Sequence, residues 1–267
     1  MVSCKEYVKE RKELLREQVD TLHRDPKLCV IQIGEDPAST SYIKGKRKDC
    51  EEVGIAFEHI HIKDYRNFSE SALINLICDR CYDTFTDGII LQLPIPDKYH
   101  VEYIQRFIGK SKDVDGFRRD SLYTPCTPKG IMDYLDYNGI RLEGKVCVVV
   151  GRSEIVGKPL VNLLIDRGAT VVSCNSKTAD LRKYTKTADI VISAIGRAEY
   201  FDSTYFTEGQ ILIDVGINRD AEGKLCGDIA EDAKSGALLA TPVPSGVGLL
   251  TRLALLENTV EAFVTGN

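Results

Sequence analysis

The feature that most constrains the fold of this chain is the alternation of short apolar runs with longer amphipathic segments. The apolar runs are expected to be strands and lie at 28–33, 55–62, 88–93, 145–150, 170–174, 189–194 and 210–215. Helices are expected at 7–22, 36–54, 69–82 and 128–138. Apolar strands separated by helices are typical of parallel β-α-β units. The sequence therefore predicts an α/β fold.

The length of 267 residues predicts about two domains, each large enough for its own core. The segment 110–127 contains a proline and several charged residues, which indicates a junction between the two domains. The runs after it recur at intervals that suit a doubly wound sheet. We therefore expect an α/β domain at the N-terminus and a Rossmann-type domain after the junction.

Charge and composition exclude several classes of protein. A net charge of -5 argues against nucleic acid as a partner, and no apolar run approaches the ~20 residues that cross a bilayer. A cytoplasmic protein without a membrane partner is expected. The nine cysteines lie mostly in apolar runs and are expected to be buried hydrophobes. Cys78 and Cys81 have metal or redox spacing, but no second pair follows, so no metal site is predicted.

Tyr42 and Lys46 are the first candidates for chemistry. Asp36 is a suitable N-cap, Pro37 suits the first helical turn and Gly54 suits the end of the helix. Four residues apart on that helix, the phenol and the amine face the same way. The alternative is a solvated basic face with a partly buried aromatic residue.

A glycine turn follows the β-branched run at 145–150. Gly151 follows the expected strand and Gly157 opens the next helix, a context in which backbone N–H groups can meet a pyrophosphate. The G-x-G-x-x-G pattern is not literal, because Ser153 and Val156 occupy its second and third glycine positions. The turn also does not match the Walker motif of phosphate-binding loops. The turn predicts a dinucleotide site, with a purely structural strand-to-helix turn as the alternative.

The end of the next strand indicates which dinucleotide is bound. NAD sites usually carry an acidic residue there, about 20 residues beyond the first glycine, whereas 173–177 contains none. Arg152, Ser176 and Lys177 can instead bind a 2′-phosphate. NADP is therefore the expected cofactor. A short-chain dehydrogenase is excluded, because there the glycine turn precedes the Tyr-x-x-x-Lys motif.

Seven motifs in order resemble the bifunctional methylenetetrahydrofolate dehydrogenase/cyclohydrolase family. They are Asp-Pro-Ala-Ser-Thr-Ser-Tyr-Ile-Lys-Gly-Lys (36–46), Gly-Ile-Ile-Leu-Gln-Leu-Pro-Ile-Pro (88–96), Lys-Asp-Val-Asp-Gly (112–116), Thr-Pro-Cys-Thr-Pro-Lys-Gly (124–130), Val-Gly-Arg-Ser-Glu-Ile-Val-Gly (150–157), Asp-Val-Gly-Ile-Asn (214–218) and Thr-Pro-Val-Pro (241–244). The resemblance extends from Leu28 to Thr259. It implies a catalytic domain of residues 1–120 plus 246–267, whose last helix, 247–263, returns to it, and a dinucleotide domain of residues 121–245.

The same resemblance implies the roles of individual residues. Lys46 is then the catalytic lysine, Gln92 its hydrogen-bonding partner, Tyr42 the residue that packs on the folate and Asp115 the acid that anchors the pterin. The cofactor residues are Gly151, Arg152, Ser153, Val156, Gly157, Ser176 and Ile217, with Arg152 and Ser176 at the NADP phosphate.

The implied function is oxidation of 5,10-methylenetetrahydrofolate with NADP, followed by hydrolysis of the methenyl product to 10-formyltetrahydrofolate. This chemistry belongs to one-carbon metabolism and supports purine biosynthesis. The resemblance also implies a homodimer. The basic cluster at 44–48 suits a polyglutamylated folate.

Three departures from the family pattern leave other functions open. Segment 244–251 reads Pro-Ser-Gly-Val-Gly-Leu-Leu-Thr where Pro-Gly-Gly-Val-Gly-Pro-Met-Thr is usual, segment 116–125 is short, and Asn175 replaces a histidine. One alternative is a two-domain NADP dehydrogenase of the shikimate or amino-acid type. The other is a family member that has lost one activity or all turnover.

Overall fold

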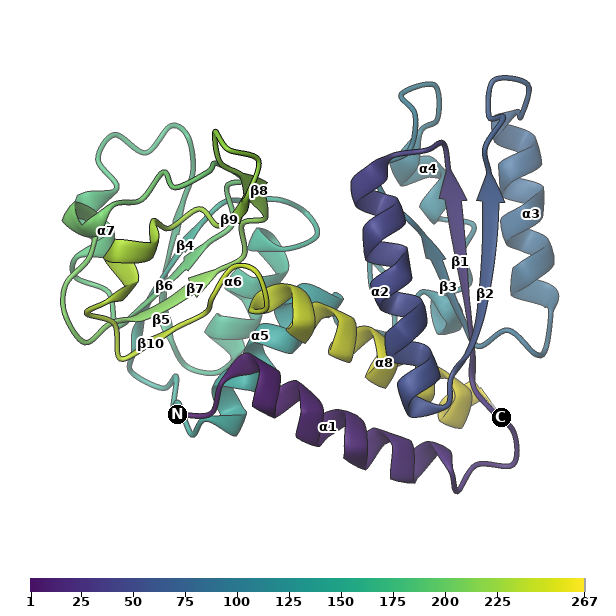
Figure 1. Ribbon diagram of the computed structural model, residues 1–267, viewed down its shortest axis with the longest axis horizontal. Helices are drawn as coiled ribbons and strands as arrows, with labels where there is room; N and C mark the ends of the chain where they lie inside the picture. Colours follow the sequence, from purple (N-terminus) through teal and green to yellow (C-terminus); the bar gives the residue numbers. More distant parts are fainter. Residues whose placement is uncertain (267) are drawn as a thin grey trace. The chain divides into compact units, whose positions relative to one another are not determined.

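The computed structural model describes residues 1–266 and divides into two compact units. One unit contains residues 10–126 and the residues from Arg252 onward, and the other contains residues 1–9 and 127–251. Helices α1 (Cys4–Val19) and α8 (Val247–Gly266) each contribute residues to both units (Figure 1). Asn267, the last residue of the expected catalytic domain, lies outside the described residues. Within 1–266, no helix has the length and apolar character needed to cross a membrane.

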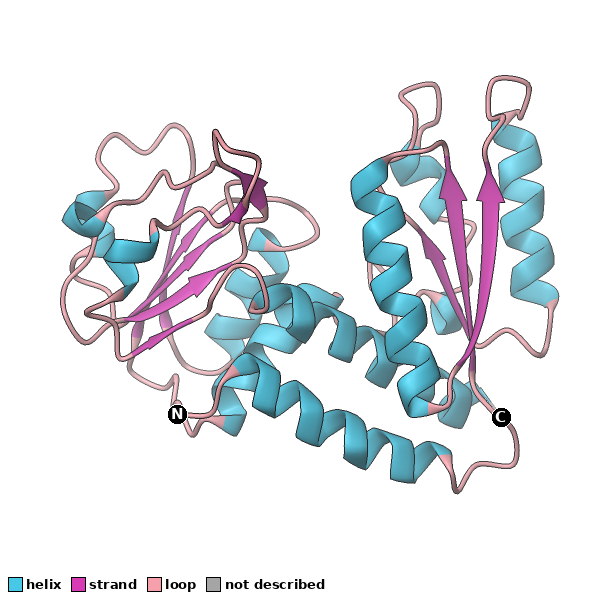
Figure 2. Ribbon diagram, viewed as in Figure 1, coloured by secondary structure: helices cyan, strands magenta, loops and turns pink. Residues whose placement is uncertain are grey.

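The unit that contains Lys46 is built on a parallel sheet of three strands, drawn as arrows in Figure 2. Its strand order is β2 (Ala56–Ile62), β1 (Lys27–Ile33) and β3 (Gly88–Leu91), and Leu28 pairs with both Phe57 and Gly88. The order reverses between β1 and β3. In open α/β sheets, ligands bind at the carboxyl ends of the strands beside such a reversal.

Alternate residues of these strands enter two separate cores, as the two-residue period of a strand requires. Leu28 and Val30 pack with residues of α1, α2 (Pro37–Val53) and α8. Cys29 and Ile31 pack with residues of α3 (Glu70–Tyr82) and α4 (Val101–Gln105). Helices therefore cover both faces of the parallel sheet, which confirms the expected N-terminal α/β domain.

The expected cap residues begin and end helix α2. The Asp36 side chain accepts a hydrogen bond from the Ser39 N–H at 2.7 Å, and Pro37 occupies the first turn. Gly54 ends the helix in the left-handed conformation, with φ +81°. Both ends of the helix that carries Tyr42 and Lys46 are therefore fixed by local sequence.

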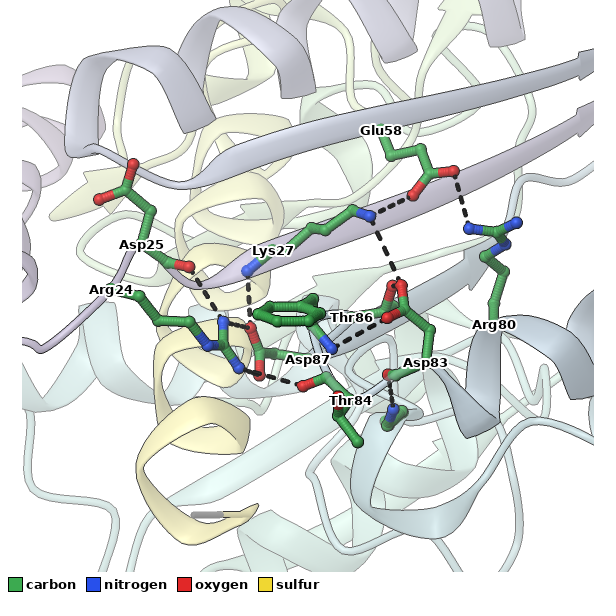
Figure 3. A network of polar contacts seen from close by, with 11 residues as sticks. Arg24, Asp25, Lys27, Glu58, Arg80, Asp83, Thr84, Thr86 and Asp87 are labelled. Atoms are coloured by element: carbon green, nitrogen blue, oxygen red, sulfur yellow. Dashed lines mark hydrogen bonds and ion pairs between the residues drawn. The ribbon is translucent and has the colours of Figure 1, made fainter.

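A network of charged residues lies where strands β1 and β3 begin (Figure 3). Asp87, only 7% exposed, accepts two hydrogen bonds from the Arg24 guanidinium at 2.8 Å and one from the Lys27 N–H at 2.8 Å. The Lys27 amine forms ion pairs with Glu58 at 2.7 Å and Asp83 at 3.6 Å. These contacts connect the first residues of the strands, at the end of the sheet opposite the carboxyl ends.

The other unit is built on a parallel sheet of five strands. Its order is β10 (Leu239–Ala240), β7 (Ile211–Asp214), β6 (Ile190–Ser193), β4 (Val146–Val150) and β5 (Thr170–Cys174). The order reverses between β4 and β6, as in a doubly wound dinucleotide-binding fold. The unit also contains α5 (Cys126–Tyr137), α6 (Gly157–Asp166), α7 (Arg182–Thr185), two short 3-10 helices at Ser203–Tyr205 and Glu231–Lys234, and an antiparallel pair, β8 (Asn218–Arg219) and β9 (Leu225–Cys226). The expected parallel, doubly wound sheet is confirmed, whereas β8, β9 and β10 have no counterpart among the expected strands.

Candidate active site and dinucleotide site

Helix α2 and the end of strand β3 bring Lys46 and Gln92 together. The Lys46 amine donates a hydrogen bond to Gln92 Oε1 at 3.1 Å, and the two residues are only 4% and 9% exposed. The Gln92 Nε2 group donates to the Leu93 carbonyl at 2.8 Å. This second bond fixes the amide so that its oxygen faces the lysine. The arrangement is a buried amine held by a neutral acceptor.

Tyr42 lies on the same face of α2, one turn before Lys46. The Lys46 amine is 5.1 Å from the centre of the Tyr42 ring, a separation that allows a cation–π interaction. Burial raises the pKa of the Tyr42 phenol, and the charge of Asp115 raises it further. The phenol therefore stays protonated at neutral pH and presents an aromatic surface beside the amine.

Asp115 sits in a tight turn after the short 3-10 helix at Lys110–Lys112. The turn requires glycine at 116, where φ is +71° and a Cβ atom would lie 2.7 Å from the Pro125 nitrogen. Burial raises the pKa of the Asp115 carboxyl, and the charge of Lys46 acts in the opposite direction. Asp115 thus interacts electrostatically with both Tyr42 and Lys46.

Sequence reasoning missed Asn258, which anchors the segment carrying Asp115. It is 1% exposed on helix α8, and its side-chain Nδ2 donates to the carbonyls of Val114 at 2.9 Å and Thr124 at 3.2 Å. A buried amide with two backbone acceptors is a strong local constraint. Its only sequence signal is an asparagine within an apolar helix.

The glycine turn between β4 and α6 has room for no side chain at two positions. At Gly151, φ is +121° and a Cβ atom would lie 2.3 Å from the Ala194 carbonyl oxygen. At Gly157, a Cβ atom would lie 2.1 Å from the Gly151 oxygen. Between them, Ser153 Oγ accepts hydrogen bonds from the N–H groups of Val156 and Gly157. The backbone is thus closely packed where the sheet order reverses, as a pyrophosphate-binding turn requires.

The end of β5 offers cationic and hydroxyl groups for a phosphate. Arg152 is exposed, and its Nε donates to Ser173 Oγ at 3.1 Å, which holds the guanidinium beside β5. Ser176 and Lys177 are exposed in the turn that follows, and the Asn175 side chain accepts from the Lys177 N–H at 3.1 Å. With no carboxylate in this turn, the residues present fit a 2′-phosphate.

Two buried aspartates, also missed, shape the loops after β6 and β7. Asp228, 0% exposed, accepts hydrogen bonds from Ser193 Oγ, Asn218 Nδ2 and the N–H groups of Ile195 and Arg197. Asp214, 1% exposed, accepts from the N–H groups of residues 216, 228 and 229. Ile217, an expected cofactor residue in one of these loops, is 60% exposed.

Ser245 stands where the family pattern has glycine and adopts a left-handed backbone with φ +78°. We expect Ser245→Gly to raise the free energy of unfolding by about 1 kcal/mol, because the strain on a side chain exceeds the extra chain entropy of glycine. Ser235→Gly is the matched control, since Ser235 has φ -62°. Equilibrium denaturation measures both; stabilisation of the control, or destabilisation of Ser245→Gly, would contradict the strain at 245.

The folds and residues described so far define a class of protein, an α/β enzyme with one doubly wound dinucleotide-binding unit and one unit that holds a buried lysine. Two family models cover most of the chain. Residues 2–115 match the catalytic domain of tetrahydrofolate dehydrogenase/cyclohydrolase, and residues 125–266 match its NAD(P)-binding domain. The chain belongs to the tetrahydrofolate dehydrogenase/cyclohydrolase family.

Individual relatives agree with this membership. The bifunctional protein FolD of Bacillus licheniformis is 42% identical over 98% of this chain and 96% of its own length. The crystal structure of the bifunctional enzyme FolD of Campylobacter jejuni is 39% identical, has a TM-score of 0.95 and matches over 99% of this chain and 98% of its own. The Trypanosoma brucei enzyme complexed with NADP cofactor and inhibitor is 28% identical, with a TM-score of 0.93 over 100% and 97% of the two chains. The family resemblance is thereby confirmed, and the shikimate-type alternative is not supported.

Proposed function

We propose that this protein oxidises 5,10-methylenetetrahydrofolate with NADP and hydrolyses the resulting 5,10-methenyltetrahydrofolate to 10-formyltetrahydrofolate. The observation that carries this proposal is the buried Lys46–Gln92 pair, because it lies in the segment that matches the family's catalytic domain. A buried amine whose hydrogen-bond acceptor is neutral is suited to accept a proton. The family assignment supplies the substrate class.

In the proposed hydrolysis, Lys46 acts as the general base. Water attacks the cationic methenyl carbon while the lysine amine takes a proton from it, which leaves a neutral hydroxyl adduct. The bond from that carbon to N5 then breaks as the hydroxyl loses its proton to form the carbonyl, and N5 takes the electron pair and a proton, so that one proton is released overall. Gln92 orients the amine. Tyr42 packs on the folate and Asp115 binds the pterin. Positioned proton transfer of this kind typically contributes a rate factor of about 100 to 10,000.

The oxidation step needs no general base on the chain, because the methylene carbon loses a hydride and becomes the methenyl cation. NADP, when bound, accepts that hydride. We assign its pyrophosphate to the turn at Gly151, Ser153, Val156 and Gly157, and its 2′-phosphate to Arg152 and Ser176. Ile217, exposed in the loop after β7, would pack against the bound cofactor in this assignment. We accordingly assign folate binding to residues 1–120 with 246–267, and dinucleotide binding to residues 121–245.

We expect Arg152→Ala to raise the KM for NADP about tenfold or more and to leave the KM for NAD nearly unchanged, since only NADP carries a 2′-phosphate. The control is Arg167→Ala, which removes an exposed arginine that pairs with Asp136 at 2.8 Å. Steady-state dehydrogenase assays with each dinucleotide measure the effect. An equal rise for NAD and NADP would refute the assignment of Arg152.

The direct test of the whole function is an assay of the purified protein with 5,10-methylenetetrahydrofolate and either NADP or NAD. Methenyl and formyl products are followed separately. We expect both products, formed faster with NADP. Accumulation of the methenyl product alone would show a family member that has lost hydrolysis, and no oxidation with either dinucleotide would overturn the proposed function.

We also propose the cellular setting that the family resemblance implies. The protein acts in the cytoplasm as a homodimer and supplies 10-formyltetrahydrofolate for purine biosynthesis. Lys44, Arg47 and Lys48 are exposed on the catalytic helix, and this positive charge supports a preference for polyglutamylated folates. Size-exclusion chromatography with light scattering tests the dimer, and KM values for mono- and polyglutamylated substrate test the preference.

A further inference from the structure

Asp49 lies on the same face of helix α2 as Lys46, three residues further along. It is 4% exposed, and so is Lys46. A carboxylate at i+3 is within reach of a lysine side chain on a helix. Such a pair would hold the amine in its ammonium form, because an adjacent negative charge favours the charged state. A free Asp49 would therefore oppose the base role proposed for Lys46.

Two other cations lie beside the two oxygens of Asp49. Lys12, on helix α1, donates a hydrogen bond to Oδ1 at 2.5 Å. Arg252, on helix α8, forms an ion pair with Oδ2, its Nε 2.6 Å away, although neither of these two atoms has a hydrogen-bond partner among residues 1–266. Lys12 also pairs with Glu52 at 2.6 Å. The partner of the Lys46 amine is instead the neutral Gln92 oxygen.

The position of Arg252 depends on a missing side chain. A Cβ atom at Gly45 would lie 2.2 Å from Arg252 Nη1 and 3.2 Å from Cζ. Gly45 is the residue directly before Lys46, so the Arg252 guanidinium lies against the backbone of helix α2. Glycine at 45 and arginine at 252 are thus sterically matched.

We propose that Arg252, with Lys12, is a positioning residue that prevents Asp49 from forming an ion pair with Lys46. The Lys46 amine then keeps its hydrogen bond to Gln92 and can act as the base. The inference rests on the proposed cyclohydrolase function and deepens it. The other titratable groups near Lys46 are Tyr42, Cys50 and Asp115. None of the three forms a hydrogen bond or ion pair with Asp49 among residues 1–266. Arg252 acts through Asp49 and has no assigned contact with substrate.

The test uses the full-length protein and three variants, Arg252→Met, Asp49→Asn and the double variant. In Arg252→Met, we expect Asp49 to pair with Lys46. The pH midpoint of the cyclohydrolase rate should then rise by about one unit and the rate at pH 7 should fall about tenfold, since one unit corresponds to a factor of ten. Adding Asp49→Asn to Arg252→Met should restore both the pH midpoint and the rate at pH 7. The dehydrogenase rate, which needs no base, is the internal control.

A merely structural role for Arg252 gives a different result, in which the midpoint stays unchanged and the double variant is as slow as the single one or slower. That result would overturn the inference. If Arg252→Met does not fold, Gly45→Ala serves instead: it should displace the guanidinium and raise the pH midpoint, and Asp49→Asn should again reverse the shift. A wild-type protein without cyclohydrolase activity would refute the proposed function itself, so the two failures are distinguishable.

Discussion

Lys46→Met is expected to lower cyclohydrolase kcat about 1000-fold, the loss typical of a positioned general base. Methionine matches the lysine side chain as far as Cε but has no amine to accept the proton from water. The change also removes the donor to Gln92 Oε1. Stopped-flow or steady-state hydrolysis of 5,10-methenyltetrahydrofolate measures the loss.

The dehydrogenase rate of the same variant distinguishes a loss of the base from a loss of folded protein. Because hydride loss requires no base, we expect oxidation of the methylene substrate to continue, with methenyl product accumulating. Lys48→Met, assayed with the monoglutamylated substrate, is the matched control, since Lys48 lies on the same helix with its side chain 77% exposed and pairs with Glu52 at 3.7 Å. Hydrolysis at the wild-type rate in Lys46→Met would rule out Lys46 as the base.

Gly151→Ala is expected to lower the free energy of unfolding by about 3 kcal/mol, with backbone strain and overpacking each contributing about 1–3 kcal/mol. The alanine Cβ would lie 2.3 Å from the Ala194 carbonyl oxygen, in a backbone conformation with φ +121°. Relief requires β4 and β6 to separate where the sheet order reverses. We therefore also expect NADP affinity to fall at least about tenfold. Denaturant unfolding and calorimetric titration with NADP measure the two effects.

Gly139→Ala isolates the steric part of this effect. Gly139 also has a positive φ, +70°, but a Cβ atom there would have no neighbour within 4 Å. We expect this control to cost only about 1 kcal/mol and to leave NADP affinity unchanged. If both variants lose equal stability, close packing at Gly151 is not the reason for its glycine.

Much of the fold was predictable because its signals are local. The buried runs around Ile31 and Val148 are apolar enough to be recognised as strands of parallel sheets. Asp36 and Gly54 mark the ends of α2 with a side-chain cap and a left-handed residue. Such signals depend on a few neighbouring residues, so they do not require knowledge of the tertiary structure. Strands β8, β9 and β10 have two residues each and are too short to show a period.

The candidate site was only partly predictable. Tyr42 and Lys46 are linked by helical spacing, and Gly151 and Gly157 by a strand-to-helix turn. Gln92 was assigned through the family motif, and the structure places it 3.1 Å from Lys46 although the two are 46 residues apart in the chain. No feature of the neighbouring sequence indicates that these two side chains lie close together.

The sequence by itself determined the alternating strands and helices, the capped helix that carries Tyr42 and Lys46, and the family to which the chain belongs. Only the tertiary structure decided which charges meet. Asp49 is paired with Lys12 and Arg252, which come from two other helices, while Lys46 is left to Gln92. The physical reason is that local structure depends on neighbours within about a helical turn, whereas a buried charge requires a partner from any element that packs against it.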